Sequence, residues 1–447
     1  MIIRGGMLAL PDYDEPVRAD IRIVDGIVVE IGKFIDGDVI VDADGLLVLP
    51  GGIDPHVHFN DPGFTEREDF FTATCFSASG GITTVIDMPC TSIPPVTSVA
   101  NLTKKLDVIS PKAIIDYGLF GGVSMQSFDE DFPLNMRKLA RYVLGFKTYF
   151  ISGMESFGRL DHFRFECVLE EAKVLGIPVL LHAEDFDYIE SATKQISKLD
   201  DGPEAFYFSR PEIAEEIAVS SAVAIAHYVG AQLHIVHLSA GSCASMVGEG
   251  DISGETAPHY LAFELDDFSL LGSALKVTPP VKSEGNIAAL WQALAEGKIS
   301  FVASDHAPCP TSEKKTGSIW TDYSGIPGSG TMLPFMVSEG YLAGKIRLSR
   351  LVEVTSTAAA RRYGISDRKG SIEVGKDADF ALFDLGSSWK VRGENFLSKG
   401  KVTPFEGKEF KGKLVKTMLR GKIIFDCDSG IEVQRGFGRY LMRSCGT

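Results

Sequence analysis

The sequence alternates repeatedly between short apolar runs and longer segments with helical periodicity. Eight apolar runs have strand character, and they cover residues 52–54, 83–86, 114–117, 143–146, 178–181, 233–236, 251–253 and 300–303. Helical spacing is clearest in the intervening segments 165–175, 211–229 and 287–295. Because runs that are apolar throughout are typical of parallel strands buried on both faces, eight β–α units in series predict an α/β fold with a TIM-like (β/α)8 barrel. A doubly wound open sheet is the alternative, but the sequence lacks the glycine-rich dinucleotide motif of that architecture.

Both ends of the chain differ from this pattern and consist of short strand-like runs separated by turns. The runs near the start cover 20–24, 27–31, 39–41 and 46–49, and those near the end cover 378–383, 415–419 and 423–425. Asp25-Gly26 is a typical hairpin turn between two of them. We therefore predict that the two ends meet in a small composite β-sandwich domain, residues 1–50 plus 375–447, beside a barrel domain of residues 51–374.

The net charge of the chain argues against two classes of partner, and its cysteine content indicates the redox compartment. The chain has 447 residues and a formal net charge of -16, so it lacks the basic face that nucleic acid or an anionic membrane requires. The cysteines, at positions 75, 90, 167, 243, 309, 427 and 445, are odd in number and form no Cys-x-x-Cys pair, which is typical of a reducing compartment. No secretory signal or apolar run of about 18 residues is apparent. We expect a cytoplasmic protein with no nucleic-acid or membrane partner.

Side chains that can bind metals stand where five of the eight predicted strands end. In chain order they are His56, His58, Lys147, His182, His237 and Asp305. The carboxyl ends of the strands in a (β/α)8 barrel converge on one mouth, where active sites lie. Because His56 and His58 are two residues apart on a strand, both imidazoles face the same side. The sequence therefore predicts that these six side chains meet.

The chemistry of this set indicates a metal centre. Imidazoles suit zinc and similar divalent ions, and six ligands are too many for one tetrahedral ion but suit two ions that share a bridging hydroxide. Lys147 could bridge two cations only as the carbamate anion that CO2 forms with its amine. Taken singly, these residues could be a core histidine, a surface lysine or a helix-capping aspartate, but the whole set favours metal binding. We interpret His162, His227 and His234 as structural, because they follow no strand end.

Several motifs resemble the cyclic amidohydrolases, a group that includes dihydroorotases, allantoinases and the hydantoinases or dihydropyrimidinases. The matching segments span nearly the whole chain: 50–58, 80–84, 145–147, 182–184, 237–239, 304–308 and 369–379. The resemblance implies two divalent metal ions, zinc by default, with His56 and His58 on one ion and His182 and His237 on the other. It also implies an N6-carboxylated Lys147 as the bridging ligand, Asp305 as a metal ligand and catalytic group, a small cyclic substrate, and a homodimer or homotetramer.

A mechanism follows from this resemblance as a hypothesis. The two ions would lower the pKa of a bridging water, so that a hydroxide attacks the ring carbonyl at working pH. Asp305 would accept the proton and pass it to the leaving nitrogen. Some relatives have lost their ligands and act as scaffolds, but all six ligand positions are filled in this sequence, which favours an enzyme.

Which cyclic substrate the resemblance implies depends on a few residues beside the candidate ligands. Dihydroorotases typically carry an arginine where this chain has Asn60, and an asparagine where it has Cys90. Hydantoinases place a tyrosine a few residues after the lysine, whereas this chain has Ser152 five residues after Lys147 and Tyr149 only two residues after it. The segments 56–63 and 86–95 are more similar to allantoinases, so allantoin is favoured, with dihydroorotate and hydantoin-type rings as alternatives. The substrate contacts that we predict are Asn60, Cys90, His259, Thr278, Ser324 and Gly325.

Overall fold

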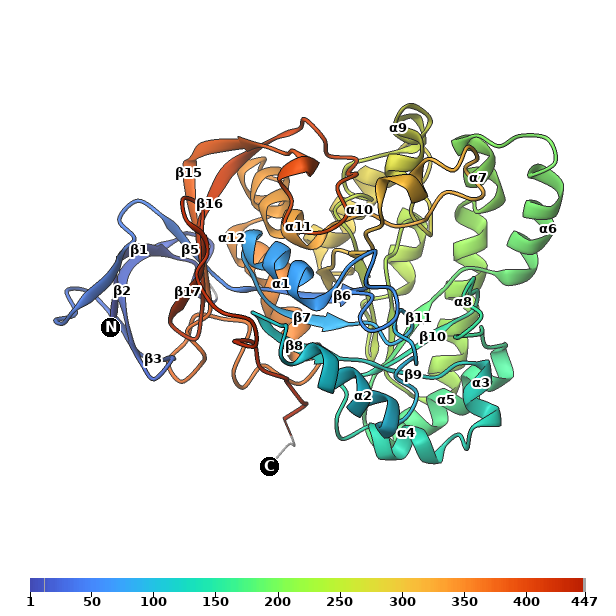
Figure 1. The fold of residues 1–447 in the computed structure, drawn as a ribbon, viewed down its shortest axis with the longest axis horizontal. Helices are drawn as coiled ribbons and strands as arrows, with labels where there is room; N and C mark the ends of the chain where they lie inside the picture. The colour runs from blue at the N-terminus through green and yellow to red at the C-terminus, as the bar shows by residue number, and fades with distance from the viewer. Residues whose placement is uncertain (12, 445–447) are drawn as a thin grey trace.

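The computed structural model describes residues 1–11 and 13–444, and its strands at both chain ends form one sheet of nine strands. In Figure 1 the blue strands of the N-terminal end and the red strands of the C-terminal end lie side by side on the left. The strand order is β18-β17-β16-β15-β5-β1-β2-β3, and β4 pairs with β1. The strands are β1 Ile2–Leu8, β2 Val17–Val24, β3 Ile27–Gly32, β4 Val39–Asp42, β5 Leu47–Pro50, β15 Phe380–Lys390, β16 Glu409–Leu419, β17 Lys422–Asp426 and β18 Gly430–Ile431.

The junction between the two ends is the antiparallel pair β5 and β15, in which Pro50 lies opposite Phe380 and Leu47 opposite Phe383. The two ends of the chain therefore share one sheet. The sequence did not predict β1, because Gly5 and Gly6 interrupt its apolar pattern. Strands β15 and β16 are also longer than predicted, since their polar halves lack the apolar run that marks a buried strand.

The parallel strands contain all eight predicted runs in whole or in part. Three strands form one sheet in the order β6-β7-β8, and six form another in the order β14-β13-β12-β11-β10-β9. They are β6 Gly52–Val57, β7 Ile82–Asp87, β8 Asp116–Leu119, β9 Gly121–Gly122, β10 Phe146–Tyr149, β11 Val179–His182, β12 Leu233–Ile235, β13 Ile252–Thr256 and β14 Phe301–Val302.

Two strands lie later in the chain than predicted. Strand β8 begins at Asp116 and β10 begins at Phe146, because the apolar residues before them are buried in the connections that lead into the strands. The later start of β10 changes the position of Lys147, which we expected at the end of a strand. It is the second residue of β10, and Tyr149 ends that strand.

Contacts between β6 and the segment after β14 join the first and last parallel strands. Val57 and His306 form a parallel bridge, and the backbone N–H of His58 donates to the carbonyl of His306 at 2.8 Å. The Asp54 carboxylate accepts from the backbone N–H of Ser304 at 3.0 Å and from its hydroxyl at 2.5 Å. These contacts bring the carboxyl ends of β6 and β14 together, which places His56 and His58 beside Asp305.

Helices surround the parallel strands on the right of Figure 1. The three predicted helical segments correspond to α5 His162–Leu175, α8 Glu212–Val229 and α10 Asn286–Glu296. The Asp161 carboxylate caps α5 by accepting from the N–H of Arg164, and Gly176 ends that helix with a positive φ of 62°. The other α-helices of eight or more residues are α1 Phe70–Ser79, α2 Val99–Ile109 and α6 Phe186–Ile196.

Shorter helical segments complete the connections. They are α3 Met125–Asp129, α4 Leu134–Leu139, α7 Pro203–Ser209, α9 Leu265–Leu271, α11 Ser329–Phe335, α12 Leu348–Val352, α13 Ala358–Arg362, and the 3-10 and π turns η1 Gly241–Met246, η2 Gly272–Leu275, η3 Thr311–Lys314, η4 Met336–Leu342, η5 Glu353–Thr357 and η6 Gly393–Asn395. Among the described residues, no helix has the length and apolar character needed to cross a membrane. The six cysteines there are all free thiols, and Cys445 lies outside the described residues.

A buried ion cluster connects the parallel strands to the nine-stranded sheet. Lys369 donates to Asp116 at the start of β8 at 2.6 Å and to Asp379 just before β15 at 2.6 Å, and it lies 2.8 Å from Asp377. The Lys369 side chain is only 2% exposed. The three carboxylates lie within 4.8 Å of one another, so Lys369 holds like charges together across the two parts of the fold.

Replacing Lys369 with methionine is expected to lower the free energy of unfolding by about 3–5 kcal/mol, because three buried carboxylates would lose their shared cation. Thermal and urea unfolding would measure the loss. Lys194→Met is the matched control, since Lys194 is 68% exposed and its pair with Glu190 is a surface ion pair worth about 0–1 kcal/mol. Equal stability of the two variants would contradict this role of Lys369.

Candidate metal centre

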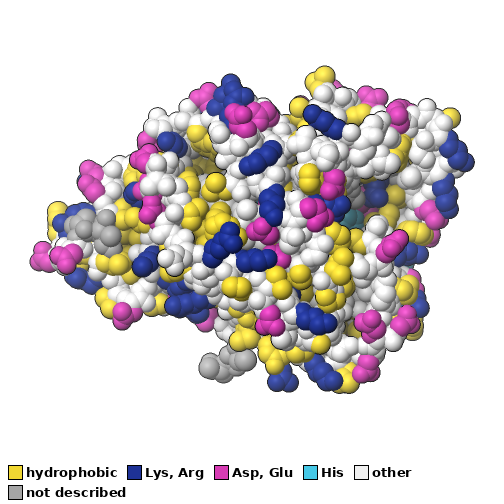
Figure 2. Space-filling model, in the orientation of Figure 1, with side chains coloured by type: hydrophobic (Ala, Val, Ile, Leu, Met, Phe, Trp, Pro, Cys, Tyr) yellow, Lys and Arg dark blue, Asp and Glu magenta, His cyan; other side chains and the backbone are white. Residues whose placement is uncertain are grey.

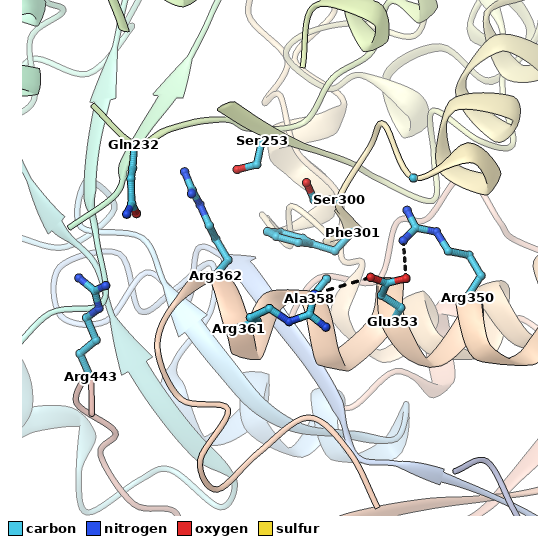
Figure 3. Close-up of a pocket in the computed structure, with 11 residues that line it drawn as sticks. Gln232, Ser253, Ser300, Phe301, Arg350, Glu353, Ala358, Arg361, Arg362 and Arg443 are labelled. Carbon is cyan, nitrogen blue, oxygen red and sulfur yellow. Dashed lines mark hydrogen bonds and ion pairs between the residues drawn. The ribbon is translucent and has the colours of Figure 1, made fainter. Parts of the chain in front are cut away.

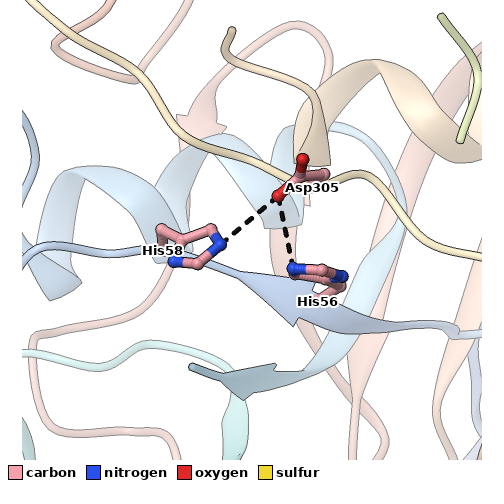
Figure 4. A group of neighbouring side chains, drawn as sticks. All are labelled: His56, His58 and Asp305. Atoms are coloured by element: carbon pink, nitrogen blue, oxygen red, sulfur yellow. Dashed lines mark ion pairs between the residues drawn. The ribbon is translucent and has the colours of Figure 1, made fainter. Parts of the chain in front are cut away.

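Three predicted ligands lie in direct contact at the carboxyl ends of β6 and β14. Asp305 Oδ1 is 3.3 Å from His56 Nε2 and 3.3 Å from His58 Nε2. Figure 4 shows both imidazoles pointing at this carboxylate from the end of β6. His56 is 1% and His58 8% exposed, so the group is almost fully removed from water. One ligand atom from each residue lies within 4.8 Å of the others, which is compatible with a shared cation.

The other two predicted histidines complete the group from the neighbouring strands. His182 ends β11, and His237 stands two residues after β12. The ring centroids of His182 and His237 are 4.5 Å apart, and those of His56 and His237 are 5.4 Å apart. The four imidazoles therefore form one continuous cluster, as the strand-end pattern predicts.

Lys147 reaches this cluster from within β10. Its side chain is fully buried, and within the described chain its Nζ has no hydrogen-bond partner. Burial lowers the pKa of the Lys147 amine to about 8, although the nearby Cys90, Glu255 and Asp305 oppose that shift. A buried amine without a partner is costly, so its environment favours a neutral or chemically modified nitrogen.

Acidic side chains behind the ligands orient the imidazoles. Glu255 in β13 contacts His56 Nδ1 at 2.5 Å and His234 Nε2 at 3.1 Å. Glu184 contacts His182 Nε2 at 2.8 Å and pairs with Arg210 at 2.7 Å. Carboxylates in such positions typically fix the ring orientation of metal-binding histidines.

The sequence pattern did not single out Glu184 and Glu255 for this role. A sequence signal exists for Glu255, since a glutamate inside an otherwise buried strand requires a polar partner. Burial opposes the ionisation of Glu184, yet Arg210 and His182 hold the pKa of that carboxyl at about 2. His234, interpreted as structural, bonds Glu255 and the Ser253 hydroxyl and thus supports the group from behind.

Two of the ligand positions have unusual backbone geometry. His237 has a φ of 42° and Asp305 a φ of 49°, both in the left-handed region that side chains other than glycine rarely adopt. Asn60 shares this property, with a φ of 59°. Such positions gather at functional sites because the surrounding structure must hold them in place.

The cluster opens into a cavity with a volume of about 490 Å³, which is large enough for a small cyclic molecule. On the face in Figure 2 a hollow lies to the right of centre, with histidine surface visible inside it. Four predicted substrate contacts line the cavity: Cys90, Thr278, Ser324 and Gly325. The other two, Asn60 and His259, are each 1% exposed and are not among the lining residues.

The cavity also contains groups that the sequence pattern did not single out. Tyr149 Oη lies 3.0 Å from Cys90 Sγ, and Arg67 stacks on Tyr323 while it pairs with Glu313 at 2.9 Å. Arg210 and Lys276 add two further cations to the lining. Tyr149 shares β10 with Lys147, whereas Arg67, Arg210 and Lys276 come from other parts of the chain and meet the candidate ligands only in the folded protein.

Comparison with known proteins identifies the family. The sequence matches the amidohydrolase family over residues 47–424. The chain belongs to the amidohydrolase family. The family match includes all six predicted ligand positions and, of the nine-stranded sheet, β5, β15, β16 and the first part of β17.

Several relatives cover almost the full length of this amidohydrolase. An allantoinase from Rubrobacter xylanophilus is 35% identical, over 99% of this chain and 97% of the relative. A dihydroorotase from Halobacterium salinarum is 34% identical, over 96% of this chain and 97% of the relative. Among solved structures, the L-hydantoinase (dihydropyrimidinase) from Arthrobacter aurescens superposes with a TM-score of 0.94 at 30% identity, covering 99% of both chains. The predicted resemblance to cyclic amidohydrolases is thus confirmed.

Proposed function

We propose that this protein hydrolyses a C–N bond of a cyclic amide or ureide, with allantoin, opened to allantoate, as the favoured substrate. The observation that carries the proposal is the meeting of four histidines and Asp305 at one cavity, together with the buried Lys147, whose Nζ has no hydrogen-bond partner among the described residues. Hydrolysis of an unactivated amide needs an activated water and a group that moves protons, and this set of side chains suits both needs.

The residues present fit a centre of two divalent ions, for which zinc is the expected metal. His56 and His58 would hold one ion and His182 and His237 the other, with an N6-carboxylated Lys147 as the bridging ligand and Asp305 as a further ligand. Two buried donor atoms support this fit, since Lys147 Nζ and His237 Nδ1 have no protein partner among the described residues. When bound, such ions supply an activated water and polarise the scissile carbonyl.

Asp305 moves the proton in the reaction we propose. Its carboxylate faces the cavity and contacts both histidines of β6. Burial would raise the pKa of this carboxyl, but the neighbouring histidines hold it well below its ordinary value, so it is ionised and ready to accept a proton. It takes the proton of the attacking water and delivers it to the departing ring nitrogen, which breaks the C–N bond.

A substrate panel tests the proposed function directly. The metal-loaded protein would be incubated with allantoin, dihydroorotate, hydantoin and dihydrouracil at equal concentration, and ring opening would be followed. We expect the highest kcat/KM for allantoin, and about two ions per chain by elemental analysis. Turnover of none of the four rings by protein with a full metal load would refute the proposal. Metal-free protein that zinc and bicarbonate fail to activate would instead indicate a non-enzymatic scaffold.

Dihydroorotase activity is the second candidate, because three cations line the cavity. Arg67, Arg210 and Lys276 could each face a substrate carboxylate, which dihydroorotate carries and allantoin lacks. Arg67 and Arg210 already have carboxylate partners, Glu313 and Glu184. Lys276 donates to the backbone carbonyl of Asp322 but forms no ion pair with a carboxylate of the described residues, so it is the cation that best suits a substrate carboxylate. A preference for dihydroorotate that Lys276→Met removes would favour this candidate over allantoinase.

We also propose the finer features of the architecture and setting. The two parallel sheets would close into one (β/α)8 barrel domain, residues 51–374, and residues 1–50 plus 375–447 would form the composite β-sandwich domain. The junction between β6 and the segment after β14 supports closure of the barrel. We further propose a cytoplasmic homodimer or homotetramer, which light scattering after size-exclusion chromatography would test.

A further inference from the structure

A second cavity lies at the opposite end of the parallel strands from the metal centre. It has a volume of 390 Å³, and Gln232, Ser253 and Ser300 line it at the beginnings of β12, β13 and β14. Its other wall comes from the helical segment that includes α13 and from Arg443 near the chain end. Figure 3 shows the side chains of Arg362 and Arg443 extending toward Gln232 between these elements.

The lining carries more positive charge than its carboxylates can balance. Four arginines line the cavity with one acidic residue: Arg350, Arg361, Arg362, Arg443 and Glu353. Glu353 is already paired, 2.8 Å from Arg350 and 3.9 Å from Arg361. Arg362 and Arg443 have no carboxylate within ion-pair distance in the described part of the chain. Two guanidinium charges therefore line the cavity without a carboxylate partner among the described residues.

These two guanidinium groups also retain unused donors. Arg362 donates through Nη2 to the carbonyl of Leu233 at 2.8 Å, but its buried Nε has no partner. Arg443 donates through Nη1 to the carbonyl of Gly176, which leaves its other nitrogens available. Burial lowers the pKa of both groups, which reflects the cost of keeping two cations out of water without a counterion.

Arg350 shows what a purely structural arginine looks like in the same place. It donates to the carbonyls of Leu294 and Ile299 at 2.7 and 2.6 Å and also pairs with Glu353, so its charge and most of its donors are satisfied. Arg362 and Arg443 differ because backbone carbonyls use only one terminal nitrogen of each, and no carboxylate of the described residues neutralises their charge. Hydrogen bonding to backbone carbonyls at the strand starts therefore does not by itself explain why Arg362 and Arg443 are there.

We propose that this cavity binds a small phosphate-bearing molecule, with Arg362 and Arg443 on the phosphate. A phosphate dianion matches two unbalanced guanidinium groups, whereas a carboxylate would balance only one, and guanidinium donors suit tetrahedral oxyanions. The Ser300 hydroxyl and the Gln232 amide supply further polar groups on the same wall. The volume exceeds that of a single phosphate and suits a phosphorylated metabolite.

Calorimetric titration of the metal-loaded enzyme with inorganic phosphate tests the proposal. We expect saturable binding whose affinity falls at least about tenfold in Arg443→Gln, since a charge-assisted hydrogen-bond pair is lost. Arg443→Lys, which keeps the charge, is expected to retain part of the affinity. Arg18→Gln is the matched control, because it removes one arginine from an exposed ion pair in the nine-stranded sheet. The phosphate affinity of the Arg18→Gln variant should equal that of the wild type.

Phosphate could also bind at the metal centre, and the variants separate the two sites. Arg443 does not line the metal cavity, so Arg443→Gln should keep the wild-type kcat and metal content while it loses phosphate binding. Circular dichroism and thermal unfolding would show that the variant is folded. Unchanged phosphate affinity in folded Arg443→Gln, an equal loss in Arg18→Gln, or no saturable binding at millimolar phosphate would each overturn the proposal. Because binding is measured without turnover, its failure is independent of the proposed hydrolase activity.

Discussion

Asp305→Asn is expected to lower kcat for ring opening by about a thousandfold, within the range that loss of a general acid–base group produces. Asparagine keeps the size of the side chain and one oxygen near His56 and His58, but it cannot accept the proton of the attacking water. The Asp305 carboxylate lies 3.3 Å from each of the two histidines, so the neutral amide should disturb the geometry little. Steady-state kinetics of the metal-loaded variant would measure the loss.

The control for Asp305→Asn is the metal content of the same preparation. A variant that retains about two ions per chain and loses turnover would assign the effect to proton transfer rather than to metal loss. The KM should change much less than kcat, since the carboxylate acts mainly in the transition state. Near-normal turnover with a full metal load would rule out the proposed role of Asp305.

Lys147→Met is the variant with the second largest expected effect. Its Nζ is fully buried at the histidine cluster without a protein partner, so removing it should remove the proposed bridging ligand and little else. We expect the metal content to fall to about one ion or fewer per chain and kcat to fall by at least about a thousandfold. Elemental analysis and steady-state kinetics on the same sample would measure both.

Two further measurements separate a carboxylated Lys147 from an ordinary lysine. Lys147→Arg keeps a cation of similar length but cannot form the carbamate, so it should lose metal as Lys147→Met does. Metal-free wild-type protein should regain activity faster with zinc and bicarbonate than with zinc alone, and labelled bicarbonate should appear in the protein as a carbamate carbon. Full metal content and activity in Lys147→Arg would contradict carboxylation.

The meeting of the candidate ligands could be predicted because the relevant information is local. His56 and His58 share a face through the two-residue period of a strand, and His182, His237 and Asp305 each follow a run of buried apolar residues. A parallel barrel brings the carboxyl ends of such strands together whatever the connecting loops contain. The alternation of apolar runs and helical segments therefore predicts both the α/β class of the fold and the position of the candidate metal centre.

Features that depend on residues far apart in the chain could not be predicted in this way. Glu255 contacts His56 across 199 residues, and Arg362 reaches the carbonyl of Leu233 across 129 residues. Lys147 lies inside β10 because hydrogen bonds to β9 and β11 determine where the strand begins. The apolar run before Lys147 does not indicate that starting point. A local pattern shows which side chains stand at the end of a strand, but which groups they meet, and which charges stay unpaired, depends on long-range packing that only the folded chain provides.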